Sequence, residues 1–157
     1  MIDTNAVSPA LASALAKRGY SSLTPVQETI LSEAPAEADL LVSAQTGSGK
    51  TVAFGLALAP TLLGDKDRLP QAGLPLALAI APTRELALQV KAELTWLYEE
   101  AGAHTASCVG GMDPRAERRT LERGAHIVVG TPGRLRDHIE RGALDLSAIR
   151  AIVLDEA

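Results

Sequence analysis

The sequence predicts an α/β domain in which helices cover both faces of a parallel sheet. Short apolar runs alternate with segments of helical periodicity along most of the 157 residues. Strands that are buried on both faces give such continuous apolar runs, whereas half-exposed strands alternate with polar residues. A glycine-rich segment also follows the first apolar run and opens a helix, which is typical of the same fold class.

Two helices are predicted ahead of the sheet. Ser8-Pro9 has the form of an N-cap followed by proline at the first helical position, and Gly19 is a natural stop. Thr24-Pro25 opens a second helix in the same way.

The first strand is predicted at 40–43, and the apolar helix that follows the glycine-rich segment is predicted to end at Pro60. Residues 64–75 are rich in Gly, Pro and charged side chains and predict a surface loop. Further strands are predicted at 76–80, 104–109, 126–130 and 151–154. Further helices are predicted to begin at 82–83, 113–114 and 131–132.

The composition is that of an ordinary soluble globular protein, with 46% hydrophobic and 22% charged residues. A net charge of −4 argues against a protein held to nucleic acid by general electrostatics. Residues 113–141 nonetheless hold seven arginines against five acidic residues, which on its own indicates solvated helix faces. The single cysteine, Cys108, falls in a predicted strand and indicates a small buried side chain rather than a nucleophile.

The apolar runs and the N-terminal residues predict a cytoplasmic protein without membrane contact. The first residues lack the basic region of a signal peptide. The longest apolar stretch, 52–63, contains Gly55 and Pro60 and is shorter than the roughly 20 residues that a membrane-spanning helix needs.

Residues 46–51 form a candidate phosphate-binding loop, because they follow an apolar strand and open a helix. Glycines such as Gly47 and Gly49 let backbone N–H groups turn toward phosphate oxygens, and the helix N-terminus adds partial positive charge. Lys50 would place its ammonium against the β- and γ-phosphates, and Thr51 its hydroxyl on Mg²⁺. A flexible glycine turn with a solvated lysine is the simpler alternative, which the flanking strand and helix disfavour.

Asp155-Glu156 follows the last apolar run and predicts the other half of an ATPase site. Ligands of open parallel sheets gather at the carboxyl ends of the strands, so this pair and the glycine-rich loop can meet. Asp155 would hold Mg²⁺, and Glu156 would orient or deprotonate the attacking water.

The general phosphate-loop pattern has glycine at the position of Ala44, and alanine there is typical of superfamily 2 helicases rather than of small-molecule kinases.

Taken together, these segments resemble the first RecA-like domain of DEAD-box RNA helicases, in the order of that family and over nearly the whole chain. The matching segments are 19–27 (the Q motif), 44–51 (motif I), 81–86 (motif Ia), Gly110-Gly111 (the GG motif), 131–134 (motif Ib) and 155–157, the first three letters of Asp-Glu-Ala-Asp.

The resemblance implies an RNA-dependent ATPase that opens short RNA duplexes, with ATP and Mg²⁺ as cofactors. Lys50 and Glu156 would be catalytic, and Thr51 and Asp155 would hold the metal. The nucleotide would be bound by Tyr20, Gln27, Ala44, Gln45, Thr46, Gly47, Ser48, Gly49, Lys50 and Thr51. Single-stranded or duplex RNA would contact Pro82, Thr83, Arg84, Gly110, Gly111, Thr131, Pro132, Gly133 and Arg134.

Simpler structural roles exist for several of these residues. The Gln27 amide can donate and accept at once, which suits an adenine edge, but Thr24-x-x-Gln27 is also a capping box. Thr83 and Thr131 have the form of ordinary N-caps, and the glycines that of ordinary turns. The joint order of the motifs is what favours the functional interpretation.

The domain organisation expected from the resemblance is a Q-motif helical region, 1–36, packed on a partial RecA-like domain, 37–157. Leu23 stands where the family usually has proline, and no aromatic residue lies near Ile2, where an adenine contact is expected. The chain stops before the last Asp of the acidic motif. A second RecA-like domain in cis, with its arginine fingers, is therefore expected to complete the site, and the chain alone is expected to be inactive. The oligomeric state stays open.

Two other classes of protein remain as alternatives. A P-loop NTPase that is not a helicase would share residues 46–51 but has no reason to carry 19–27 or 131–134. Loss of Lys50, Thr51 or Glu156 would favour a non-enzymatic RNA-binding module, and all three residues are present.

Overall fold

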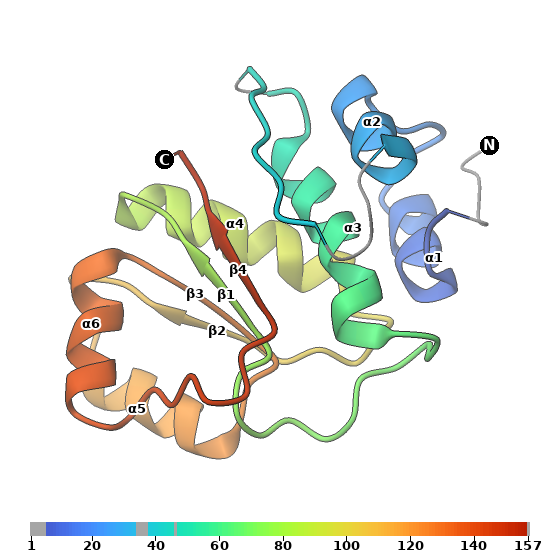
Figure 1. Ribbon diagram of the computed structural model, residues 1–157. Helices are drawn as coiled ribbons and strands as arrows, with labels where there is room; N and C mark the ends of the chain where they lie inside the picture. The colour runs from blue at the N-terminus through green and yellow to red at the C-terminus, as the bar shows by residue number, and fades with distance from the viewer. Residues whose placement is uncertain (1–5, 34–37, 46, 157) are drawn as a thin grey trace.

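The computed structural model describes residues 6–33, 38–45 and 47–156, and it consists of a parallel sheet with helices on both faces (Figure 1). Within the described residues the sheet has four strands in the order β2-β3-β1-β4, and every neighbouring pair is parallel. The predicted α/β class, a parallel sheet with helices on both faces, is confirmed.

The elements follow the predicted alternation along most of the chain. The strands are β1 (Ala77–Ile80), β2 (Thr105–Cys108), β3 (Ile127–Gly130) and β4 (Ala151–Leu154). The helices are α1 (Pro9–Lys17), α2 (Pro25–Glu33), α3 (Lys50–Leu63), α4 (Arg84–Leu97), α5 (Pro114–Arg123) and α6 (Pro132–Glu140). None of the helices in the described part of the chain is long and apolar enough to cross a bilayer.

The helices begin where the sequence supplies a cap or a proline. Proline has no N–H to leave unpaired in the first turn, and it starts α1, α2, α5 and α6. The Thr83 hydroxyl accepts from the Leu86 N–H at 3.3 Å, and the Asp113 carboxylate accepts from the Arg115 N–H at 2.9 Å. The predicted starts of α4 and α5 are thus confirmed together with their capping residues.

The alternate residues of the strands enter two separate cores. On one face, Ala77, Ala79, Ile127 and Val129 pack against the apolar sides of α3 and α4. On the other face, Leu78 and Val128 pack against Leu135 of α6 and its neighbours. The period of two along the strands therefore serves both layers, and the central strands β1 and β3 are buried from both sides.

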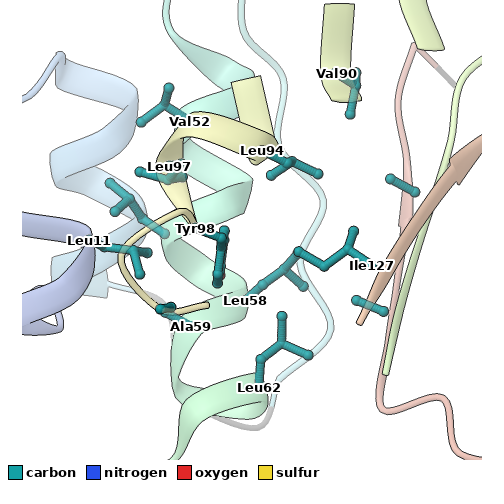
Figure 2. Close-up of a cluster of buried hydrophobic side chains, with 14 of the residues drawn as sticks. Leu11, Val52, Leu58, Ala59, Leu62, Val90, Leu94, Leu97, Tyr98 and Ile127 are labelled. Carbon is teal, nitrogen blue, oxygen red and sulfur yellow. The ribbon is translucent and has the colours of Figure 1, made fainter. Parts of the chain in front are cut away.

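Tyr98 joins α3 to α4 at the centre of the larger core. Its ring lies among Leu94, Leu97 and Leu58 in Figure 2 and is fully buried. Its hydroxyl donates to the Gly55 carbonyl at 2.5 Å, and burial raises the pKa of this hydroxyl. The two helices approach closely because position 55 lacks a side chain: a Cβ there would lie 2.6 Å from Leu97 Cδ2.

The strand predicted at 40–43 is wrong, because these residues form no strand and lie outside the sheet. Leu41 is fully exposed, and the edge strand β4 leaves Ile152 and Leu154 58% and 64% exposed. A short apolar run is consistent with a strand but does not specify a pairing partner, so the run alone could not predict whether the segment joins a sheet.

The helix end predicted at Pro60 is also wrong, since α3 continues through Pro60 to Leu63. Proline costs most in a helix interior, where an N–H bond is lost and its ring meets the preceding turn. Here Pro60 lies in the last turn, and the residues beyond it, Leu62 and Leu63, are buried in the larger core. Burial of these two side chains offsets the lost hydrogen bond.

Replacing Tyr98 by Phe should lower the free energy of unfolding by about 1 kcal/mol, because a buried hydrogen bond to the Gly55 carbonyl is lost. Tyr20→Phe is the matched control, since the Tyr20 hydroxyl makes no hydrogen bond within the described residues. Urea denaturation of the chain measures both. Equal effects of the two substitutions would contradict the role given to Tyr98.

Candidate functional site

Most of the predicted site residues lie at one edge of the sheet. Ile80, Gly130 and Leu154 are register partners, and Cys108 pairs with Gly130, so all four strands end at the same level. The segments that follow the strands are 81–84, 109–113, 131–134 and 155–156. The parallel register therefore brings these segments, which are distant in sequence, to the same edge of the sheet.

Lys50 connects α3 with the acidic pair after β4. Its Nζ lies 3.2 Å from Asp155 Oδ1 and 3.2 Å from Glu156 Oε1. Asp155 is held by its own N–H, which donates to the Ile80 carbonyl at 2.8 Å. Desolvation lowers the pKa of Lys50, but the Asp155 and Glu156 carboxylates together outweigh it, so the pKa is raised and the ammonium stays charged.

Two features of the acidic pair are typical of a functional site. Glu156 has φ 56°, a left-handed conformation that costs roughly 1–2 kcal/mol for a residue with a side chain. Asp155 is largely buried, and among the described residues the partner of its Oδ1 is the Lys50 ammonium at 3.2 Å. A buried carboxylate oxygen with spare acceptor capacity suits a cation or a water bound to one.

The glycine-rich loop has the backbone that its sequence predicts. Gly47 and Gly49 both have φ 82°, and Gly49 is the residue that precedes α3. The Ser48 N–H donates to the Gln45 carbonyl at 3.1 Å, while the buried Ser48 hydroxyl has no hydrogen-bond partner among the residues that the structure describes. Ala44 and Thr51 are half-buried and flank the loop, and Thr46 lies outside the described residues. An unsatisfied hydroxyl beside a helix N-terminus and an ammonium fits a phosphate group.

Gln27 is fully buried and tethers α2 to this loop. Its Oε1 accepts from the Thr24 N–H at 3.0 Å, which is one half of the capping box, and its Nε2 donates to the Gly49 carbonyl at 3.1 Å. The cap is therefore present, and the contact with adenine stays a prediction. Tyr20 packs near Trp96, with ring centroids 5.9 Å apart.

The residues predicted to face RNA form a second group around the loop 109–112. Pro82, Thr83, Arg84, Gly110, Gly111, Pro132 and Gly133 are exposed, and Thr131 and Arg134 are half-buried. Arg134 Nη1 donates to the Met112 carbonyl at 3.1 Å, and the Thr131 N–H donates to the Cys108 carbonyl at 3.0 Å. The Arg84 guanidinium lies against the same loop, 3.7 Å from Met112 Sδ. The structure thus brings motifs Ia, GG and Ib into one surface.

Two buried residues of this region were missed by sequence reasoning. Glu117 and His138 lie beneath the loop, and Glu117 Oε1 contacts Arg134 Nη1 at 2.8 Å and His138 Nε2 at 2.9 Å. The sole sequence signal was the spacing of Arg134 and His138, four residues apart on one face of α6. Glu117 lies in an arginine-rich helix, where the sequence indicates a solvated side chain.

A metal at this place is disfavoured, although Cys108, Glu117 and His138 offer ligand atoms within 4.8 Å of one another. Burial raises the pKa of the Cys108 thiol to about 12, so binding a metal there would first require displacing a tightly held thiol proton. A cation would also compete with Arg134 for the same Glu117 oxygen.

The fold and the paired sites define a class, the RecA-like α/β domains. A family model described as DEAD/DEAH box helicase matches residues 24–157. The chain belongs to the DEAD/DEAH box helicase family.

Similar proteins carry names of the same kind. The chain is 40% identical over 96% of its length to DEAD-box ATP-dependent RNA helicase 9 of Oryza sativa subsp. japonica, covering 24% of that protein. It is 46% identical over 90% of its length to DEAD-box ATP-dependent RNA helicase CshA of Streptococcus pneumoniae serotype 4, covering 26%. It is 40% identical over 92% to ATP-dependent RNA helicase DbpA of Bacillus subtilis, covering 29%. The chain spans about a quarter of the length of these relatives.

Gly49→Ala should destabilise the chain more than Gly47→Ala does. Both positions have φ 82°, so each alanine incurs roughly 1–2 kcal/mol of backbone strain. A Cβ at position 49 would also lie 2.4 Å from Gln27 Nε2, whereas a Cβ at position 47 would meet no described residue within 4 Å.

Urea denaturation of the two variants measures the difference between their free energies of unfolding. Adding Gln27→Ala to both should make this difference smaller, because the clash with the Gln27 amide is removed. Equal stability of the two alanine variants would mean that Gln27 does not hold the loop.

Proposed function

We propose that the chain is the ATP- and RNA-binding front part of an ATP-dependent RNA helicase that couples ATP hydrolysis to local RNA duplex opening. The observation that carries this proposal is the position of Lys50, between the glycine-rich loop and the Asp155–Glu156 pair. A second group of exposed Arg, Thr and Gly residues lies further along the same edge of the sheet. Membership of the helicase family supports the same conclusion.

The nucleotide site is assigned to the loop and the first turn of α3. N–H groups of residues 47–51 and the Ser48 hydroxyl would contact phosphate oxygens, and Lys50 would leave its carboxylate partners to balance phosphate charge. Thr51 and Asp155 are the residues suited to hold Mg²⁺, which when bound supplies positive charge against the phosphates. Ala44, Gln45 and Thr46 complete the loop, and Tyr20 and Gln27 are assigned to the adenine side.

Hydrolysis requires a residue that orients water and groups that stabilise the negative charge that develops. Glu156 is exposed and held by Lys50, so its carboxylate can accept the proton of an attacking water once phosphate draws the ammonium away. Lys50 then stabilises charge on the transferred phosphoryl group. In relatives four times as long, further groups can supply the remaining charge, so we propose that the 157-residue chain by itself turns ATP over slowly.

RNA is assigned to the surface formed by motifs Ia, GG and Ib. Exposed Arg84, the hydroxyls of Thr83 and Thr131 and the open backbone at Gly110-Gly111 and Pro132-Gly133 suit phosphate and sugar contacts. Such contacts ignore base identity, which fits a helicase that acts on many sequences. Closure of a second RecA-like domain over both sites would couple them.

Single-stranded RNA should stimulate ATP hydrolysis by the full-length protein that carries this chain, and Glu156→Gln should reduce the stimulated rate by about 100-fold or more, because a general base is lost. Glu140→Gln is the matched control, since Glu140 is an exposed partner of Arg136 remote from Lys50. Steady-state ATPase assays with and without RNA provide the measurement.

Hydrolysis that is robust but unaffected by RNA would point to a P-loop NTPase that is not a helicase. RNA binding that is indifferent to ATP, without turnover, would point to a non-enzymatic RNA-binding module.

A further inference from the structure

Helix α5 buries a carboxylate where a helix normally buries an apolar side chain. Glu117 is the one residue of α5 classed as buried, and its side chain is 7% exposed. The rest of α5 is dominated by exposed charged residues, four of them arginines. A buried charge is costly unless it is fully paired, so its presence here needs an explanation beyond packing.

Three donors from two other segments satisfy this carboxylate. Oε2 accepts from the Val109 N–H at 2.9 Å, while Oε1 accepts from Arg134 Nη1 at 2.8 Å and from His138 Nε2 at 2.9 Å. Because an ionised carboxylate can only accept, His138 carries its proton on Nε2. Val109 follows β2, and the other two donors belong to α6. Glu117 therefore ties α5, α6 and the end of β2 to one point.

The tie extends directly to the proposed RNA surface. Val109 opens the loop 109–112, and Arg134 holds the other end of that loop through the Met112 carbonyl at 3.1 Å. Arg84 closes over the same loop: a Cβ at Gly111 would lie 2.8 Å from Arg84 Nη1. The Arg134 side chain is 14% exposed, and its Nη1 donates inward to both Glu117 and Met112.

We infer that Glu117 is a positioning residue for RNA binding: it fixes the loop 109–112 and the Arg134 side chain in the arrangement that an RNA backbone meets. Arg134 acts chiefly by linking the Glu117 carboxylate to the Met112 carbonyl of the loop, rather than by binding phosphate. This inference rests on the proposed function and adds to it a buried residue that touches neither nucleotide nor RNA.

The sign of the effect distinguishes positioning from electrostatics. A carboxylate near a phosphate-binding surface repels RNA, so its removal would strengthen binding if charge alone mattered. Positioning makes the opposite prediction, because without the carboxylate the loop and Arg134 each lose a hydrogen bond to a charged group, and His138 loses a third.

The test compares Glu117→Gln with Glu122→Gln in the full-length protein that carries this chain. Glu122 lies on the same helix and pairs with Arg118 at 3.1 Å on the exposed side, so the control removes the same charge outside the network. RNA-stimulated ATPase gives the RNA concentration at half-maximal stimulation and the KM for ATP. Glu117→Gln should raise the first on the order of tenfold, the effect of losing about 1.4 kcal/mol, with the KM for ATP unchanged.

His138→Phe serves if Glu117→Gln does not fold, since it keeps the ring's bulk and removes one donor. It should raise the RNA concentration at half-maximal stimulation severalfold. The inference would be overturned if a folded Glu117→Gln or His138→Phe variant had an unchanged or lower RNA concentration at half-maximal stimulation. An equal rise of that concentration in Glu122→Gln would also overturn it. A loss of thermal stability with the RNA dependence intact would also overturn it, because that is the mark of a purely structural role. If RNA does not stimulate the unmodified protein, the proposed function itself fails, which is a separate outcome.

Discussion

The parallel register of four strands is the constraint on which both candidate sites depend. Ile80, Gly130, Leu154 and Cys108 end their strands at one level, so the residues that follow them share one edge of the sheet. Lys50 reaches this edge from α3 and meets carboxylates more than a hundred positions later in the chain. A strand of opposite direction at any of these places would send its loop to the far edge and remove a motif from the site.

The two sites are adjacent but are held together by different means. Strand β1 pairs with both β3 and β4, so the loop 81–84 lies between the acidic pair and the segment 131–134. On the nucleotide side, the ion pair between Lys50 and Glu156 is partly exposed, and Gly47 and Gly49 beside it have left-handed backbone conformations. Lys50 can therefore exchange its carboxylate partner for another anion. On the RNA side, a buried carboxylate with three donors leaves little freedom. Such a contrast suits a site that must exchange ligands beside a surface that must keep its shape.

Local patterns predicted the elements well and the long-range contacts poorly. Thr83 and Asp113 cap the helices that they were predicted to open. The edge site was also predictable, since Lys50 and Asp155 each follow or open an element of known direction. The strand predicted around Leu41 was wrong because an apolar run does not determine which strand it pairs with. The helix end predicted at Pro60 was wrong because burial of Leu62 offsets the cost of proline in the last turn. The contact of Glu117 with His138 depends on how α5 packs on α6, which no single segment encodes.

The most direct test of the account is the titration of Lys50 in the ligand-free chain by NMR. The ammonium is flanked by Asp155 and Glu156, which raise its pKa more than burial lowers it. We expect a Lys50 pKa above the ordinary value for lysine, falling toward that value in the Glu156→Gln variant. A Lys50 pKa at or below the ordinary value, or one that Glu156→Gln leaves unchanged, would mean that α3 and the end of β4 do not meet, and the site as described would not exist.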